Sequence, residues 1–139
     1  MPAPLVEATL EQLRTDRSKW FADRAQGYFA THLRPGVSQA MIDAEIQRCL
    51  SAAPYAAVEM QRQVFNTDQR PDVAALTVPT LVLHGLADQS IPIEISSHHL
   101  VKLAPHPVLK EYWDAGHGLY LTNQKEVNVE ILDFIRRRS

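Results

Sequence analysis

Two polar residues, Asp88 and His117, stand in segments where a carboxylate and an imidazole could work as a pair. Asp88 follows the run His84-Gly85-Leu86-Ala87, and His117 lies between Gly116 and Gly118. A carboxylate bound to one imidazole nitrogen fixes the tautomer and stabilises the protonated ring. The other nitrogen is then free to take a proton from a nucleophile. The two residues are 29 positions apart, enough for one helix and one strand.

The elements around this pair indicate a parallel sheet. Residues 79–85 form a short apolar, β-rich run that ends in glycine, typical of a strand buried in such a sheet. Residues 92–105 predict a helical segment bounded by prolines, and residues 108–113 a second strand. Asp88 and His117 would then follow neighbouring strand ends, about 4.8 Å apart, where α/β sheets collect functional groups.

A last helix is predicted after Asn123, which with Glu126 resembles a capping box. The order strand, helix, strand, helix is the repeat of a doubly wound α/β sheet. Two strands alone leave open edges and uncovered faces, so we expect further strands from elsewhere. The expected buried face of the last helix consists of Val127, Ile131, Phe134 and Ile135.

The chain before residue 75 has helical periodicity only. Ser38 is a plausible N-cap for one helix, and Pro54 can begin the next. We therefore divide the chain into a helical region, 1–75, and the α/β region, 76–139. The apolar residues expected to face inward include Val6, Leu10, Leu13, Trp20, Phe21, Tyr28, Phe29, Ile42, Ile46, Cys49, Leu50, Met60, Val64 and Phe65.

The polar residues singled out by their chemistry also have simpler, structural interpretations. Asp88 could be a turn aspartate bonded to its own backbone, and His117 a loop histidine bonded to main chain. His84 is expected to be a partly buried residue at a strand end. The neighbouring pair His98-His99 is not expected to bind metal, because adjacent imidazoles on a helix point to different faces.

Residues 71–139 resemble the C-terminal part of the α/β-hydrolase fold, and are similar to the cofactor-free haloperoxidase, arylesterase and perhydrolase group. The helical region resembles the cap of that group through Asp16-Arg17, Trp20-Phe21 and Thr67-Asp68. The segments that carry the resemblance of the α/β region are Asp72-Val73, Val78-Pro79-Thr80-Leu81-Val82-Leu83-His84-Gly85, Ala87-Asp88, Ile91-Pro92, Gly116-His117-Gly118 and Val127-Asn128.

The resemblance implies a partial α/β-hydrolase fold: a helical cap followed by the last two strand–helix units of the sheet. It implies that Asp88 is the acid of a catalytic triad and His117 its general base, and that Trp20 and Phe21 line the substrate pocket. The implied substrate is a small carboxylic ester or acid. The implied enzyme needs neither a metal nor an organic cofactor.

One part of the family pattern is missing. Family members carry a G-x-S-x-G nucleophile turn, and none of the serines of this chain lies in that spacing; they are Ser18, Ser38, Ser51, Ser90, Ser96, Ser97 and Ser139. Because triad members act as a unit, the chain alone is predicted to be inactive or nearly so. An upstream segment, a second chain or a homo-oligomer would complete the sheet. The alternative is a non-catalytic chain that folds by association.

The composition predicts the cellular location of the protein and disfavours some classes of binding partner. A net charge of −2 and a pI of about 6.3 disfavour nucleic acid and anionic membranes. No apolar run approaches the roughly 20 residues that span a bilayer, and the N-terminus does not resemble a signal peptide. The single cysteine, Cys49, excludes an internal disulfide. These features predict a cytoplasmic protein.

Overall fold

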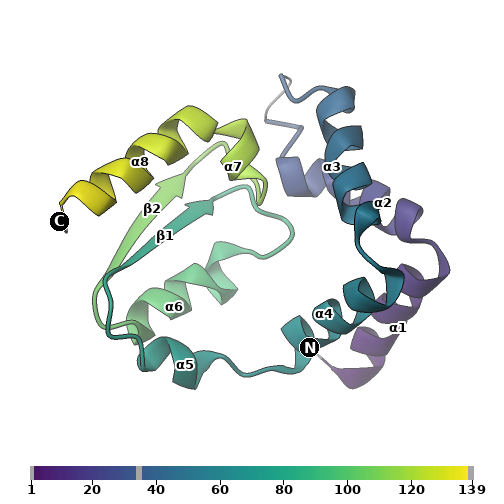
Figure 1. Cartoon of the computed structure of the whole chain (residues 1–139), viewed down its shortest axis with the longest axis horizontal. Helices are drawn as coiled ribbons and strands as arrows, with labels where there is room; N and C mark the ends of the chain where they lie inside the picture. The colour runs from purple at the N-terminus through teal and green to yellow at the C-terminus, as the bar shows by residue number, and fades with distance from the viewer. Residues whose placement is uncertain (1, 34–35, 138–139) are drawn as a thin grey trace. The chain divides into compact units, whose positions relative to one another are not determined.

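The computed structural model describes residues 2–33 and 36–137, which form two compact units (Figure 1). The helical unit consists of Met1–Ala25 and Ser38–Asp68, and the sheet unit of Gln26–Val37 and Gln69–Ser139. The short segment from Gln26 therefore belongs with the sheet, although it lies within the range 1–75 that the sequence assigns to the cap. The division into cap and core by role stays a prediction.

Capping side chains begin two helices of the helical unit, and prolines begin the other two. Its elements are α1 (Ala3–Thr15), the first part of α2 (Arg17–Phe29), α3 (Gln39–Ser51) and α4 (Pro54–Asn66). Asp16 has a non-helical backbone and its Oδ1 accepts a bond of 2.8 Å from Lys19 N, which starts α2. The predicted N-cap Ser38 is confirmed, since its hydroxyl accepts from Met41 N at 3.2 Å. Pro54 begins α4, as predicted.

The core of the helical unit is aliphatic. Leu10 and Leu13 of α1 are almost fully buried with Val6, and Val58 of α4 completes the cluster. The expectation that Met60 and Val64 face inward is wrong, because both are exposed. The apolar residues of α4 lie on more than one side of the helix, so periodicity did not select the face; Val58 and Phe65, two turns apart, are the ones that pack on this core.

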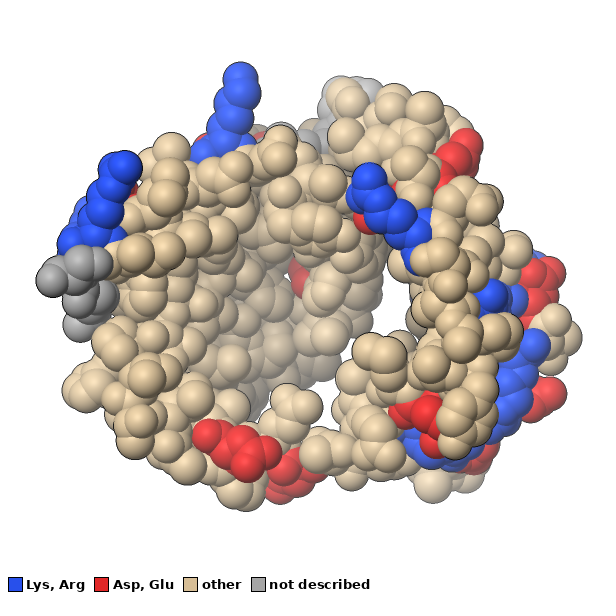
Figure 2. All heavy atoms as spheres, in the orientation of Figure 1, with Lys and Arg blue, Asp and Glu red and all other residues tan. Residues whose placement is uncertain are grey.

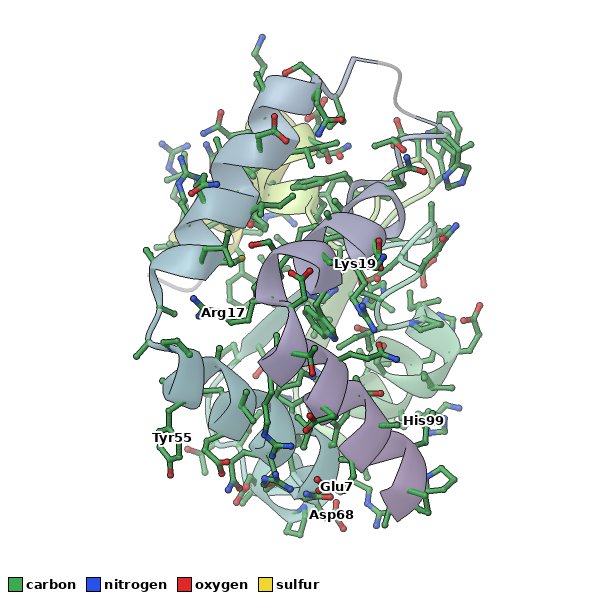
Figure 3. All side chains as sticks on the ribbon, turned by 90° about the vertical axis from the view of Figure 1, so that its right-hand side faces the viewer. Glu7, Arg17, Lys19, Tyr55, Asp68 and His99 are labelled. Atoms are coloured by element: carbon green, nitrogen blue, oxygen red, sulfur yellow. The ribbon has the colours of Figure 1, made fainter. Side chains whose placement is uncertain are left out.

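Arg17 links α2 to the turn between α3 and α4. Its guanidinium donates to the carbonyls of Leu50 at 3.0 Å and Ala52 at 2.8 Å, which are C-terminal acceptors of α3 (Figure 3). A cation at helix carbonyls is favourable because those groups have no partner within the helix. The expectation that Cys49 is packed is wrong: it lies in the last turn of α3 and is exposed.

The sheet unit has the predicted order of strand, helix, strand and helix. Its two strands are parallel, with Thr80 opposite Pro107 and Gly85 opposite Tyr112, so both strands end at the same edge. The elements are the end of α2, α5 (Arg70–Ala74), β1 (Thr80–Gly85), the 3₁₀ turn η1 (Ile93–Ile95), α6 (Ser97–Leu103), β2 (Pro107–Tyr112), α7 (Leu119–Thr122) and α8 (Gln124–Arg136).

The α8 helix is only partly covered. Val127 packs with Ala115 and Leu119 against Leu83 and Tyr112, whereas Ile131 and Ile135, also expected to be buried, are exposed. A two-stranded sheet offers too little surface to cover the whole apolar stripe of this helix. On the face in Figure 2, the surface over β1, β2 and α8 carries few charged side chains.

The predicted capping box at the start of α8 does not form. Asn123 is buried, and its side chain accepts a bond of 2.8 Å from the Thr122 hydroxyl in place of a helix amide. The short helix α7 directly before it holds residues 119–122 in a helical turn, so Asn123 does not adopt the extended backbone of an N-cap. In the described part of the chain, no helix combines the length and apolar character needed to cross a membrane.

Candidate active site

The loops after β1 and β2 are joined by main-chain hydrogen bonds that continue the ladder beyond the strands. Leu86 N donates to Tyr112 O at 2.8 Å, and Ala87 N donates to Ala115 O at 2.9 Å. Gly85 permits this approach, because a Cβ at that position would lie 2.2 Å from the carbonyl oxygen of Ala115. The residues that follow these loops are therefore held at fixed positions relative to each other.

Asp88 and His117 meet across these loops. Asp88 is 7% exposed, and its Oδ2 accepts a hydrogen bond of 2.7 Å from His117 Nδ1. Its other oxygen, Oδ1, accepts from the amides of Ser90 at 2.8 Å and Ile91 at 2.9 Å. Three donors thus fix both carboxylate oxygens. The structure brings the two sequence-predicted residues into direct contact, and their catalytic roles stay predictions.

The surroundings of Asp88 favour its ionised form. Burial raises the pKa of the carboxyl group, but the hydrogen bond and charge of His117 and the two loop amides outweigh it, so the pKa lies below its ordinary value. An ionised carboxylate only accepts, so the proton of this bond belongs to His117 Nδ1. The lone pair of the neutral imidazole is then on Nε2. This is the tautomer that a general base needs.

The end of α2 places an aromatic ring beside His117, which sequence reasoning did not predict. The rings of Tyr28 and His117 have centroids 5.0 Å apart, and Tyr28 O accepts from Gly118 N at 3.0 Å. The Tyr28 hydroxyl donates to that of Tyr120 at 3.3 Å. His117 keeps 39% of its side chain exposed. Periodicity placed Tyr28 on an apolar helix face and gave no signal of this contact.

His84 is a second residue near the site whose contacts the sequence did not predict. It is 8% exposed, its Nδ1 lies 2.7 Å from Ser97 Oγ, and its Nε2 lies 3.1 Å from Ile91 O. Its Nε2 is also 3.6 Å from Asp88 Oδ2. A histidine that ends an otherwise apolar strand was the available signal, since a buried polar side chain needs partners.

Trp20 and Phe21, the predicted pocket residues, belong to the helical unit. Their rings meet edge to face at 5.0 Å and pack against the core of that unit. Arg24 stacks over the Trp20 ring at 4.1 Å from its centroid. Their part in a substrate pocket stays a prediction. Among the residues that the structure describes, no group of three or more His, Cys, Asp or Glu side chains is arranged to hold a metal.

Several known proteins are similar to this chain in sequence or in structure. No family model matches the chain. It is 33% identical over 97% of its length to a non-heme haloperoxidase of Rhodococcus erythropolis, covering 50% of that protein, and 30% identical over 98% to a non-heme chloroperoxidase of Burkholderia pyrrocinia, again covering 50%. Among solved structures, a bromoperoxidase from Bacillus anthracis matches 98% of the chain with a TM-score of 0.88 and 25% identity, over 50% of its own length. An esterase from Exiguobacterium antarcticum matches 98% with a TM-score of 0.87 and 19% identity, over 49% of its length.

The chain is therefore similar to non-heme haloperoxidases, and its fold is part of the α/β-hydrolase fold. It spans about half the length of the curated relatives it matches. The partial fold inferred from sequence, with helices followed by two parallel strand–helix units, is confirmed.

The hydroxyl groups of two serines near the site, Ser96 and Ser97, have partners other than His117. Ser97, which is buried, bonds to His84, and the hydroxyl of Ser96 donates to Pro92 O at 2.9 Å. The main-chain N–H of Ser90 donates to Asp88 Oδ1. Ser139 lies outside the described residues. In the described ranges, no serine hydroxyl is hydrogen-bonded to His117.

Proposed function

We propose that this chain supplies the acid and the general base of a serine hydrolase that acts on small carboxylic esters. The observation that carries the proposal is the 2.7 Å bond between His117 Nδ1 and Asp88 Oδ2 at the ends of two neighbouring parallel strands. The nucleophile is a serine of a segment outside these 139 residues, either in the same polypeptide or in a second chain.

In the proposed reaction, the serine oxygen attacks the ester carbonyl carbon while its proton moves to His117 Nε2. The protonated ring, held through Nδ1 by Asp88, gives that proton to the leaving alcohol as the ester C–O bond breaks. Water then attacks the acyl-serine, passing its proton to the same nitrogen. The carboxylic acid leaves as the proton returns to the serine. Asp88 stays ionised throughout and stabilises the cationic ring.

The test is ester hydrolysis by the complete protein that carries this chain. His117→Ala should reduce the turnover of p-nitrophenyl acetate by on the order of 10⁴-fold, because the base and its proton relay are lost together. His99→Ala is the matched control, since His99 is exposed and should leave the rate unchanged (Figure 3). Equal rates for the two variants would remove the proposed role of His117.

Relatives named haloperoxidases suggest hydrogen peroxide as a second acyl acceptor. We propose that peroxide replaces water in attacking the acyl-serine: one peroxide oxygen bonds to the acyl carbon while His117 takes its proton, and the acyl–serine C–O bond breaks as that proton passes to the serine oxygen. The product is a peroxycarboxylic acid. Measuring peracid formation from acetate esters with and without peroxide tests this extension. It fails if peroxide leaves the products unchanged while hydrolysis proceeds.

A non-catalytic role by association is the second candidate. It rests on the two-stranded sheet and on exposed apolar residues of α8, namely Val129, Ile131, Leu132 and Ile135. Such a face needs a cover, which an upstream segment, a second chain or another copy would provide. Sedimentation of the isolated chain distinguishes the cases. A stably folded monomer of 15.7 kDa would count against association.

A further inference from the structure

We propose that His84 is a positioning residue for Asp88, held in one neutral tautomer by the carbonyl of Ile91 on one side and the buried hydroxyl of Ser97 on the other. Its consequence for catalysis rests on the proposed function, whereas its structural role does not. The juxtaposition is a buried imidazole between Ser97 on one side and the Asp88 loop on the other. The proposed reaction itself does not use this histidine.

The two neighbours of the His84 ring determine its tautomer. Ile91 O is a carbonyl and can only accept, so the 3.1 Å contact makes His84 Nε2 the protonated nitrogen. Nδ1 then carries the lone pair and accepts the hydroxyl proton of Ser97 across 2.7 Å. Both ring nitrogens are satisfied in the neutral form. The Nε2–H end also faces Asp88 Oδ2 at 3.6 Å, so its partial positive charge supports the carboxylate.

His84 reaches Asp88 through the main chain of Ile91. Ile91 N donates to Asp88 Oδ1 at 2.9 Å, while Ile91 O accepts from His84 Nε2 at 3.1 Å. Residue 91 is therefore held on one side by the acid and on the other by the strand-end histidine. If His84 Nε2 is removed, the loop keeps its bonds to Asp88 but loses its anchor to β1. The direction of Oδ2 towards His117 Nδ1 then becomes less well fixed.

The burial of this pair also argues for a positioning role. His84 and Ser97 are among the buried polar side chains of the described residues, and both lie where β1 meets the start of α6. Packing a strand on a helix needs only apolar side chains, and a buried polar pair costs free energy unless every group is bonded. Compared with an apolar pair, this polar pair adds one directed contact. The N–H at His84 Nε2 points to Ile91 O in the loop that holds Asp88.

The test is nuclear magnetic resonance of the full chain with labelled histidine and aspartate. His84→Asn is shorter and loses the donor to Ile91 O, whereas His84→Gln can still place an amide N–H there. In the asparagine variant, we expect the His117 Nδ1–H proton to exchange with water roughly tenfold faster, the effect of losing about one hydrogen bond. The pKa of Asp88 should also move upward. The glutamine variant should restore both signals.

Two serines provide a matched pair for the same measurement. Ser97→Ala removes the hydroxyl that donates to His84 Nδ1 and should accelerate exchange of the His117 proton, though less than His84→Asn. Ser96→Ala removes a hydroxyl that donates to Pro92 O and should change nothing at His117. Native-like amide spectra are required of all variants.

Three results would overturn the proposal: an unchanged signal in His84→Asn, equal loss in the asparagine and glutamine variants, or equal effects of Ser96→Ala and Ser97→Ala. A glutamine variant that alone unfolds would also count against it, because the retained donor is what the proposal requires. None of these readouts depends on ester hydrolysis. A complete protein that fails to cleave esters would refute the proposed function and leave this result standing.

Discussion

The helical unit and the sheet unit bury different kinds of side chain. The helical unit buries aliphatic residues, with Leu10 and Leu13 at its centre, and leaves its ion pairs, such as Lys19–Asp23, on the surface. The sheet unit also has an apolar cluster, but it buries the polar His84, Asp88, Ser97 and Asn123 with hydrogen-bond partners. Since a polar group is costly to bury without a partner, a buried polar network depends on exact geometry in a way that an aliphatic core does not.

This difference indicates how each unit should respond to substitution. An aliphatic core loses free energy in proportion to the atoms removed and the cavity left. A polar site loses it when one contact is displaced, even where no volume is removed. Substitutions that separate these two responses therefore test whether the units are as different as their buried residues suggest.

The largest effect is expected for Leu10→Ala in the helical unit. Leu10 is fully buried between α1 and α4, so its loss should lower the free energy of unfolding by about 3 kcal/mol. Met60→Ala is the control on α4 and should cost far less, because Met60 is exposed. Hydrogen exchange followed along the chain should show the loss in residues of the helical unit. Equal loss in the amides of β1 and β2 would show that the comparison between units is wrong.

Sequence reasoning succeeded where local pattern determines structure. Ser38 and Pro54 marked helix starts because capping and proline geometry depend on neighbouring residues only. The runs 79–85 and 108–113 marked parallel strands because apolar β-rich segments bounded by turns are distinctive. Asp88 and His117 could then be paired, since parallel strand ends share one edge.

It failed where a neighbour distant in sequence decides the outcome. Periodicity could not choose between Val58 and Met60 as inward residues of α4, because both are apolar and the choice depends on where α1 lies. Ile135 fits the apolar stripe of α8, yet the two-stranded sheet does not cover it. The contact of Tyr28 with His117 joins residues far apart in the chain. No local pattern carries such information.

A smaller effect is expected for Gly116→Ala in the sheet unit. A Cβ at Gly116 would lie 2.5 Å from Tyr28 O and 2.9 Å from Ala30 N, both main-chain atoms. Ala30 already has φ of 49°, in the left-handed region, so this segment cannot shift freely. We expect a loss of about 2 kcal/mol in unfolding free energy, typical of overpacking.

Gly36→Ala is the control for that substitution, because a Cβ there meets nothing within 4 Å. It should leave stability unchanged or raise it slightly by restricting the unfolded chain. Urea unfolding of both variants measures the difference in their free energy of unfolding. Gly116→Ala should also perturb the nuclear magnetic resonance signals of His117. If the two alanine variants were equally stable, the close packing of the α2 end against the His117 loop would be refuted.

The smallest effect, and the most specific to the polar site, is expected for Asp88→Asn. The amide keeps nearly the same volume but removes the charge that His117 and the loop amides bind, which should cost about 1.5 kcal/mol at neutral pH. The pKa of Asp88 is lowered in the folded state, so its contribution is fully present above the unfolded value of about 3.9 and is lost as pH falls through the folded value. The stability difference between wild type and Asp88→Asn should therefore shrink as pH falls below about 4. Urea titrations across this range measure it. A difference that persisted in acid would mean that shape, and not the charge of Asp88, stabilises the site, and the contrast with the aliphatic helical unit would disappear.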